Sequence, residues 1–143
     1  MREILFRAKR LDNGEWVEGF YVCLNGIEHM IYNGYAETDC GEFYPDFFQV
    51  DPETVCQYTG LTDKNGNKIW ENNILSEDWG NDKGIVRFGD FKSIMLKNVG
   101  FNIEWICEIY YRQDLRYWAE KCEVVGNIFD NPELMEGGVA DET

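Results

Sequence analysis

The sequence predicts a mainly β protein, with an N-terminal antiparallel meander followed by a second group of short strands and one or two short helices. Three observations support this fold class. Apolar and polar residues alternate with a period of two in several stretches. Turn segments rich in Asn, Asp and Gly separate these stretches. Aromatic residues, which are enriched in strands, make up 15% of the chain.

The N-terminal part predicts three antiparallel strands. Glu3–Ala8 alternates as a first strand, and Asp12-Asn13-Gly14 is a hairpin turn signal before the returning strand Trp16–Leu24. Asn25-Gly26 favours a type I′ turn, because both residues tolerate positive φ angles, and it leads into Ile27–Tyr32.

The next stretch, Asn33–Pro45, contains two glycines, a proline and scattered acids, which break every period. It predicts either a long loop or a short irregular hairpin.

The central stretch, Asp51–Leu75, predicts three strands joined by a turn and a bend. Apolar and polar residues alternate from Val55, and Gly60 is expected to end that strand. Asp63-Lys64-Asn65-Gly66 has the composition of a tight turn in which the Asp side chain bonds its own backbone. Ile69-Trp70 then resumes the apolar pattern.

Beyond this stretch, Ile85–Phe88 predicts a short strand that Gly89-Asp90 turns into a second one, Phe91–Leu96. Phe101–Tyr111 shows the clearest alternation in the chain and predicts a long strand. Gln113–Lys121 has the spacing of a short helix.

Glu123–Val125 predicts a last strand, and Pro132 suits the first position of a terminal helical turn. We therefore expect an N-terminal β subdomain over residues 1–60, a second β subdomain over residues 61–135 and a flexible tail over residues 136–143.

Three motifs resemble the YopX-like family of phage and prophage proteins. They are the opening pattern of Phe6-Arg7-Ala8 and Trp16-Val17-Glu18-Gly19, the central segment Glu53–Leu75, and the C-terminal segment Asn127–Met135. The chain departs from the family pattern at two places. Cys56 stands where the family commonly has Gly, and Asn72-Asn73 stands where it commonly has Gly-Asp. The second departure removes the carboxylate that a metal-binding or capping role of that Asp would need.

The resemblance implies no established biochemical activity. The segment that follows the central turn and begins a strand is also similar to the first strand of SH3-like barrels. By this analogy the second subdomain is expected to be an SH3-like, partly open barrel.

The net charge of −14 disfavours direct binding to nucleic acid, because affinity for phosphates comes mostly from Lys and Arg. No Lys or Arg occurs from Leu11 to Asp63, so we expect a negative N-terminal surface whose carboxylates have no local basic partner. This surface either only solubilises the protein or attracts a basic partner.

The sequence carries no motif for catalysis, nucleotide binding or zinc. His29 is the only histidine, and the five cysteines are spread widely without a CxxC pair, so they are interpreted as small buried apolar residues. No cofactor and no metal are predicted. The chain lacks an apolar run of membrane-spanning length and a signal peptide, so we expect a cytoplasmic protein of the bacterial host.

The aromatic residues are the candidates for a binding surface, because Tyr and Trp dominate interface hot spots. Trp79 lies in an acidic, Gly-rich stretch, and adjacent aromatic residues of a strand cannot both face one core. The candidate partner-binding residues are Trp79, Tyr110, Tyr111, Tyr117 and Trp118.

The favoured hypothesis is a non-enzymatic phage or prophage accessory protein, an acidic module that binds a host or phage protein. The partner would be basic or would handle DNA, and mimicry of nucleic acid is a special case. The alternative is a small-ligand-binding protein or a carboxylate-based enzyme with a groove between two β subdomains. A homo-oligomer stays open, because exposed β edges and aromatic residues often pair.

Overall fold

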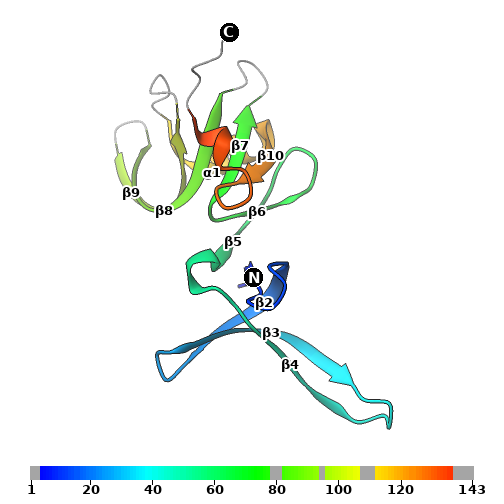
Figure 1. Cartoon of the computed structure of the whole chain (residues 1–143). Coiled ribbons are helices and arrows are strands. Elements are labelled where there is room, and N and C mark those ends of the chain that lie inside the picture. The colour runs from blue at the N-terminus through cyan, green and yellow to red at the C-terminus, as the bar shows by residue number, and fades with distance from the viewer. Residues whose placement is uncertain (1–3, 78–81, 94–95, 107–111, 137–143) are drawn as a thin grey trace. The chain divides into compact units, whose positions relative to one another are not determined.

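The computed structural model describes residues 4–77, 82–93, 96–106 and 112–136 (Figure 1). The chain forms two compact units, Met1–Tyr58 and Thr59–Thr143. The predicted mainly β fold, with an N-terminal meander and short helices, is confirmed.

The first unit is an antiparallel meander of β1 (Phe6–Lys9), β2 (Trp16–Leu24), β3 (Glu28–Glu37) and β4 (Phe43–Gln49), in the order β4-β3-β2-β1. A 3₁₀ turn, Pro52–Thr54, follows. The start of β5 (Cys56–Thr62) then pairs with β1 on the side away from β2.

Both predicted turns of the meander are confirmed. Gly14 has a φ of 74°, a value that favours glycine. Asn25 and Gly26 have φ angles of 56° and 69°, and the Ile27 amide donates to the Leu24 carbonyl at 3.0 Å. Two positive φ angles define the expected type I′ turn.

Strand β2 is shared between two partners, and Gly19 marks the change. Residues 16–19 pair with β1, whereas residues 20–24 pair with β3. A Cβ at Gly19 would lie 2.1 Å from the carbonyl oxygen of Tyr32. The last residue of the Trp16–Gly19 motif is therefore glycine because the backbone of β3 passes too close for any side chain.

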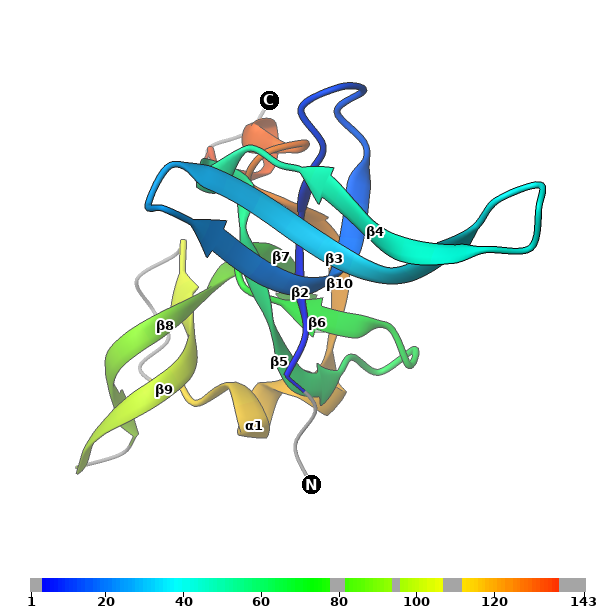
Figure 2. The same ribbon diagram turned by 90° about the horizontal axis from the view of Figure 1, so that it is seen from below.

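The stretch from Asn33 to Pro45 is an irregular hairpin, one of the two predicted alternatives. The register of β3 against β4 shifts between Tyr32 and Tyr35, which is a β-bulge. Beyond Tyr32, within the described residues, β3 pairs with β4 but no longer with β2. Residues 33–45, which we call the arm, form a two-stranded ribbon that extends past β1 and β2 (Figure 2).

The core of the first unit lies on one face of its sheet. Ala8, Val17, Ile31 and Val50 are buried there, and Phe6, Tyr21, Phe48 and Val55 pack against them. The register places Tyr21, Ile31 and Phe48 side by side on β2, β3 and β4. Their neighbours in sequence point to the other face, because side chains alternate along a strand. These neighbours are Phe20, Tyr32 and Phe47.

The second unit contains the end of β5 and β6 (Lys68–Trp70), together with a four-stranded antiparallel sheet. Its strands run in the order β10 (Cys122–Asn127), β7 (Asn73–Glu77), β8 (Lys83–Ser93), β9 (Leu96–Trp105). No pairing among the described strands closes this sheet into a barrel. The predicted SH3-like, partly open barrel is thus confirmed as an open β unit, and its likeness to an SH3 barrel stays a prediction.

Two predicted boundaries in this unit are wrong. Gly60 does not end its strand, because β5 continues to Thr62 with Gly60 at a φ of 86°. Gly89-Asp90 is not a turn, because β8 runs without interruption from Lys83 to Ser93. Gly89 lies opposite Gly100, with φ angles of 152° and 156°, so two facing glycines adopt positive φ angles inside a ladder whose register is continuous.

The predicted strand over Phe101–Tyr111 corresponds to the second half of β9, which ends at Trp105; residues 107–111 lie outside the described residues. The predicted short helix is confirmed as α1 (Leu115–Trp118) and a 3₁₀ turn over Ala119–Lys121. Another 3₁₀ turn, Pro132–Met135, begins with proline as predicted.

Helix α1 closes the core of the second unit (Figure 1). Leu115, Trp118 and Ala119 are buried against residues of the sheet. The strands contribute Leu75, Val86, Ile103, Trp105 and Cys122 to this cluster. None of the helices in the described residues is long and apolar enough to cross a membrane.

The prediction that the five cysteines are buried is correct for only some of them. Cys56 and Cys122 are buried, whereas Cys23 and Cys40 are exposed. The exposed pair lies near hairpin ends, where the core does not reach. Cys107 lies outside the described residues.

Candidate functional site

The five predicted partner-binding residues fall into two groups. Trp79, Tyr110 and Tyr111 lie outside the described residues. Tyr117 and Trp118 are adjacent residues of α1 in the second unit.

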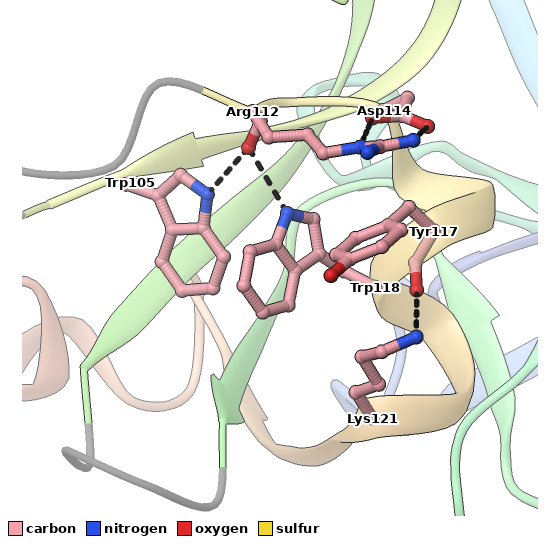
Figure 3. Close-up of polar contacts among 6 residues, drawn as sticks. All are labelled: Trp105, Arg112, Asp114, Tyr117, Trp118 and Lys121. Carbon is pink, nitrogen blue, oxygen red and sulfur yellow. Dashed lines mark hydrogen bonds and ion pairs between the residues drawn. The ribbon is translucent and has the colours of Figure 1, made fainter.

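Trp118 is a core residue with only 4% of its surface exposed. Its indole N–H donates to the carbonyl oxygen of Arg112 at 3.0 Å, and the indole of Trp105 donates to the same oxygen at 3.1 Å (Figure 3). The two indole rings meet edge to face, 5.0 Å apart. This arrangement satisfies the polar atoms of two buried tryptophans and leaves little of Trp118 for a partner to contact.

Tyr117 lies against two cations. The guanidinium carbon of Arg112 is 3.9 Å from the centre of its ring, and the Nζ atom of Lys121 is 4.1 Å from it. Both cations have a second contact within the unit: Arg112 Nε donates to Asp114 at 2.8 Å, and Lys121 donates to the Tyr117 carbonyl at 3.2 Å (Figure 3).

The hydrogen bond to Asp114 is the main reason that the pKa of Arg112 lies above its ordinary value. The contacts around Tyr117 link Arg112 and Asp114 to α1. The geometry gives this cluster a structural role in the second unit.

A different aromatic surface lies on the outer face of the first unit. Phe20, Tyr32 and Phe47 stand directly opposite one another on β2, β3 and β4. Their ring centres are 6.3 Å apart from Phe20 to Tyr32 and 5.2 Å apart from Tyr32 to Phe47. Phe20 is 56% exposed and Phe47 is 45% exposed.

The arm continues this row on the same face. Tyr35 lies opposite Pro45 and meets Tyr32 edge to face at 6.0 Å. Phe43 lies two residues before Pro45 and therefore shares its face. Tyr35 is 68% exposed and Phe43 is 70% exposed. We call Phe20, Tyr32, Tyr35, Phe43 and Phe47 the aromatic face.

Tyr35 also affects the ionisation of Tyr32. The side-chain hydrogen bond with Tyr35 is the largest cause that raises the pKa of Tyr32 above its ordinary value, and desolvation adds to it.

The arm carries exposed carboxylates and contains no basic residue. Glu37, Asp39 and Glu42 are exposed, and the segment from Glu28 to Gln49 contains no Lys or Arg. Glu37 pairs with Phe43 in register, so its side chain shares the aromatic face.

Carboxylates nearer to β1 do have cations beside them, so the expectation that none has a basic neighbour is wrong for this part. Arg10 binds Asp12 at 2.6 Å, and this hydrogen bond is the main reason that the pKa of Asp12 is lowered. Arg7 lies opposite Glu18 on the paired strands. Arg10 and Asp12 are two residues apart in sequence, whereas strand pairing brings Arg7 to Glu18 across the hairpin.

A hollow of about 370 Å³ lies next to the aromatic face, lined by Leu11, Asp12, Phe47, Phe48 and Gln49. Its carboxylate, Asp12, is already bound by Arg10. His29 accepts or donates a hydrogen bond at 2.5 Å with the Tyr21 hydroxyl, on the opposite face of the sheet. In the described part of the chain, no group of three His, Cys, Asp or Glu residues is placed to hold a metal.

One sequence signal could have found the aromatic face. Adjacent aromatic residues of a strand cannot both face one core, and the rule applies to Phe20-Tyr21 and Phe47-Phe48. Tyr21 and Phe48 pack on the core, whereas Phe20 and Phe47 face solvent. The alternation alone did not show which member of each pair is exposed.

The structure defines a two-unit, mainly β protein with an exposed aromatic face on its first unit. Residues 5–136 match the YopX protein family, and the chain belongs to this family.

A solved structure, that of protein EF1440 from Enterococcus faecalis, is similar to this chain with 20% sequence identity and a TM-score of 0.53. The similarity covers 95% of this chain and 100% of the other. At this level of identity the likeness shows the fold alone. A comparison with curated protein sequences gives no match.

Proposed function

We propose that this chain is a non-enzymatic accessory protein of a phage or prophage that binds a host or phage protein through its aromatic face. One observation carries the proposal: five aromatic side chains share one outward face of the first unit, and four of them are among its large exposed hydrophobic residues.

Exposed aromatic side chains of this kind are costly to leave in water. Each exposed ring forgoes the favourable transfer of its apolar surface out of water. A contiguous exposed apolar patch on a folded protein therefore often marks an interaction site. Aromatic rings are also enriched in the cores of protein interfaces, where they supply large and rigid contact areas.

The experiment is capture of partners from nuclease-treated bacterial lysate, followed by mass spectrometry. The variants are Phe20→Ser with Phe47→Ser on the aromatic face, and Phe88→Ser as the matched control. Phe88 is also a phenylalanine with 56% exposure, but it lies on β8 of the second unit.

We expect a partner that the unchanged chain and the Phe88→Ser variant retain and that the double variant loses. Circular dichroism spectra of all three proteins check that they are folded. The proposal is wrong if the double variant retains every partner that the Phe88→Ser variant retains, or if no protein is captured.

A further inference from the structure

We propose that the aromatic face takes a basic, extended segment of the partner protein, with Lys or Arg side chains lying over its rings. This inference rests on the proposed function and names the chemistry of the partner.

The aromatic rings of the arm are exposed to solvent. Beyond Tyr32 the described residues of β3 have β4 as their ladder partner, so the arm is only two strands wide. A two-stranded ribbon buries little of its own surface and is marginally stable alone. Tyr35 and Phe43 are accordingly the most exposed members of the aromatic face, at 68% and 70%.

The rings of the aromatic face differ in one respect from those of Trp16, Phe48 and Tyr117, which have cations over them. Arg10 lies 4.3 Å from the centre of the Phe48 ring, and Arg7 lies 4.4 Å from that of Trp16. Within the described residues, no Lys or Arg lies over a ring of the aromatic face. These rings are thus available to cations from another molecule.

The negative charge of the arm also favours a basic segment. Glu37 shares the face with Phe43, and Asp39 and Glu42 lie in the connection at the end of the arm. A cation placed over the rings is attracted by the negative ring faces and by these carboxylates together. A neutral apolar segment would gain neither attraction, and an acidic segment would be repelled by the carboxylates.

A second copy of the chain does not fit this chemistry. The chain carries a net charge of −14, and two arms brought together would place their carboxylates against each other. A basic partner removes this repulsion.

The spacing of the rings favours an extended segment. Phe20, Tyr32 and Phe47 form a line across the strands, with ring centres 6.3 and 5.2 Å apart. Tyr35 lies beside this line, 6.0 Å from Tyr32. In an extended chain, side chains on one side recur every second residue, at roughly 6.6 Å. Alternate residues of one segment can therefore meet Phe20, Tyr32 and Phe47 in turn.

The test uses a fluorescent peptide of alternating Arg and Gly, about 12 residues long, which spans roughly 40 Å when extended. Peptides of the same length with Gln or Glu in place of Arg are the controls. Fluorescence anisotropy measures the affinity of each peptide for the full chain at about 50 mM and about 300 mM NaCl.

Two double variants test the surface. Tyr35→Ser with Phe43→Ser removes rings, and Glu37→Gln with Glu42→Gln removes charges. The matched controls lie in the second unit: Phe88→Ser for exposed aromatic area, and Glu120→Gln with Glu133→Gln for the same change in net charge. Glu120 and Glu133 are exposed.

We expect the Arg peptide to bind, with affinity lowered about tenfold by the ring variant and about fivefold by the charge variant. The controls are expected to stay within about twofold, and binding is expected to weaken at the higher salt concentration. Weaker binding of the Gln peptide and no binding of the Glu peptide complete the expected result.

The inference is overturned if the Arg peptide does not bind, if the Gln peptide binds equally well, or if the control variants lower affinity as much as the arm variants. Should any of these occur while lysate capture still depends on Phe20 and Phe47, the partner chemistry is wrong and the proposed function stands. If the peptide result and the lysate result both fail, the inference and the proposed function are both wrong.

Discussion

At the scale of residues, Asp63 connects the central turn to a distant strand of the second unit. Its carboxylate accepts hydrogen bonds from the amides of Asn65 at 2.9 Å and Asn67 at 2.8 Å, and from the amide of Val124 on β10 at 2.9 Å. Burial alone would raise the pKa of Asp63, but the three amide donors outweigh burial and lower it.

We predict that Asp63→Asn lowers the free energy of unfolding by about 2 kcal/mol at neutral pH, because the amide cannot accept all of these hydrogen bonds. Since the folded pKa is depressed, this stabilisation is present above the unfolded pKa of about 4 and is lost as the pH falls through the folded pKa. Urea unfolding of both proteins across this range measures the difference.

The exposed Asp90 supplies the control for this experiment. Asp90→Asn is expected to change the free energy of unfolding by less than about 0.5 kcal/mol. A difference between wild type and Asp63→Asn that stays constant down to the lowest pH would contradict the assigned role of the carboxylate.

The two asparagines that depart from the family pattern keep the bend after β6. Asn72 has a φ of 71°, a value that Gly adopts most readily and Asn tolerates. Asn73 accepts a hydrogen bond from the Trp70 amide at 2.7 Å and donates to the Gly126 carbonyl at 3.5 Å. The position thus has a local structural role that an amide fulfils.

The C-terminal motif is also explained by local contacts. A Cβ at Gly126 would lie 2.4 Å from the Oδ1 atom of Asn131. Asn131 Oδ1 accepts from the Asn127 amide at 3.1 Å, and the Asn127 side chain accepts from the amides of Phe129 and Asp130 at 2.9 Å. Gly126, Asn127 and Asn131 therefore define one tight turn.

We predict that Gly19→Ala destabilises the first unit by about 3 kcal/mol, because the added Cβ meets a backbone carbonyl that cannot rotate away. Gly14→Ala is the matched control: it puts a side chain at a φ of 74°, but nothing lies within 4 Å. Its cost is expected to be about 1 kcal/mol. Equal effects of the two substitutions in thermal unfolding would contradict the steric explanation.

At the scale of elements, β3 shows how one strand serves two purposes. Its first half belongs to the sheet and buries Ile31, whereas its second half leaves the sheet after a bulge and forms the arm. The bulge lets the backbone bend away from β2. The sheet fixes one end of the arm while the other end presents aromatic and acidic side chains.

We predict that Tyr35→Ser and Phe43→Ser each change the free energy of unfolding by less than about 0.5 kcal/mol, because both side chains are exposed. Ile31→Ala, on the opposite face, is expected to cost about 3 kcal/mol. Urea unfolding monitored by tryptophan fluorescence and circular dichroism measures all three. A large loss of stability in the arm variants would mean that these rings support the fold.

At the scale of the whole chain, the charge of −14 acts against compact folding through self-repulsion. Ion pairs such as Arg87 with Glu104 at 3.0 Å and Arg112 with Asp114 at 2.8 Å are local and partly exposed. Pairs of this kind contribute little to stability.

We therefore predict that added salt stabilises the protein. Raising NaCl from about 10 mM to about 300 mM shortens the screening length, and we expect a gain of about 1 kcal/mol, equivalent to a few degrees in Tm. Thermal unfolding at neutral pH measures it. A Tm that falls with salt would show that favourable ion pairs outweigh the repulsion between carboxylates.

The sequence by itself determined the features that depend on neighbours in the chain. Period-two alternation and the turn residues predicted the mainly β fold, the type I′ turn at Asn25-Gly26 and the turn at Asp63. Each depends on local φ preferences or on the alternation of side chains across a strand. The same rules did not distinguish the continuous strand at Gly89 from a turn, because glycine permits both.

Only the tertiary structure decided which aromatic residues reach solvent. Phe20 and Tyr21 have the same local pattern, and Tyr117-Trp118 resembled an exposed pair although Trp118 is buried. Exposure depends on which face of each strand meets the core and on where β3 leaves β2. Those choices are set by contacts between residues far apart in the chain, such as the approach of Tyr32 to Gly19.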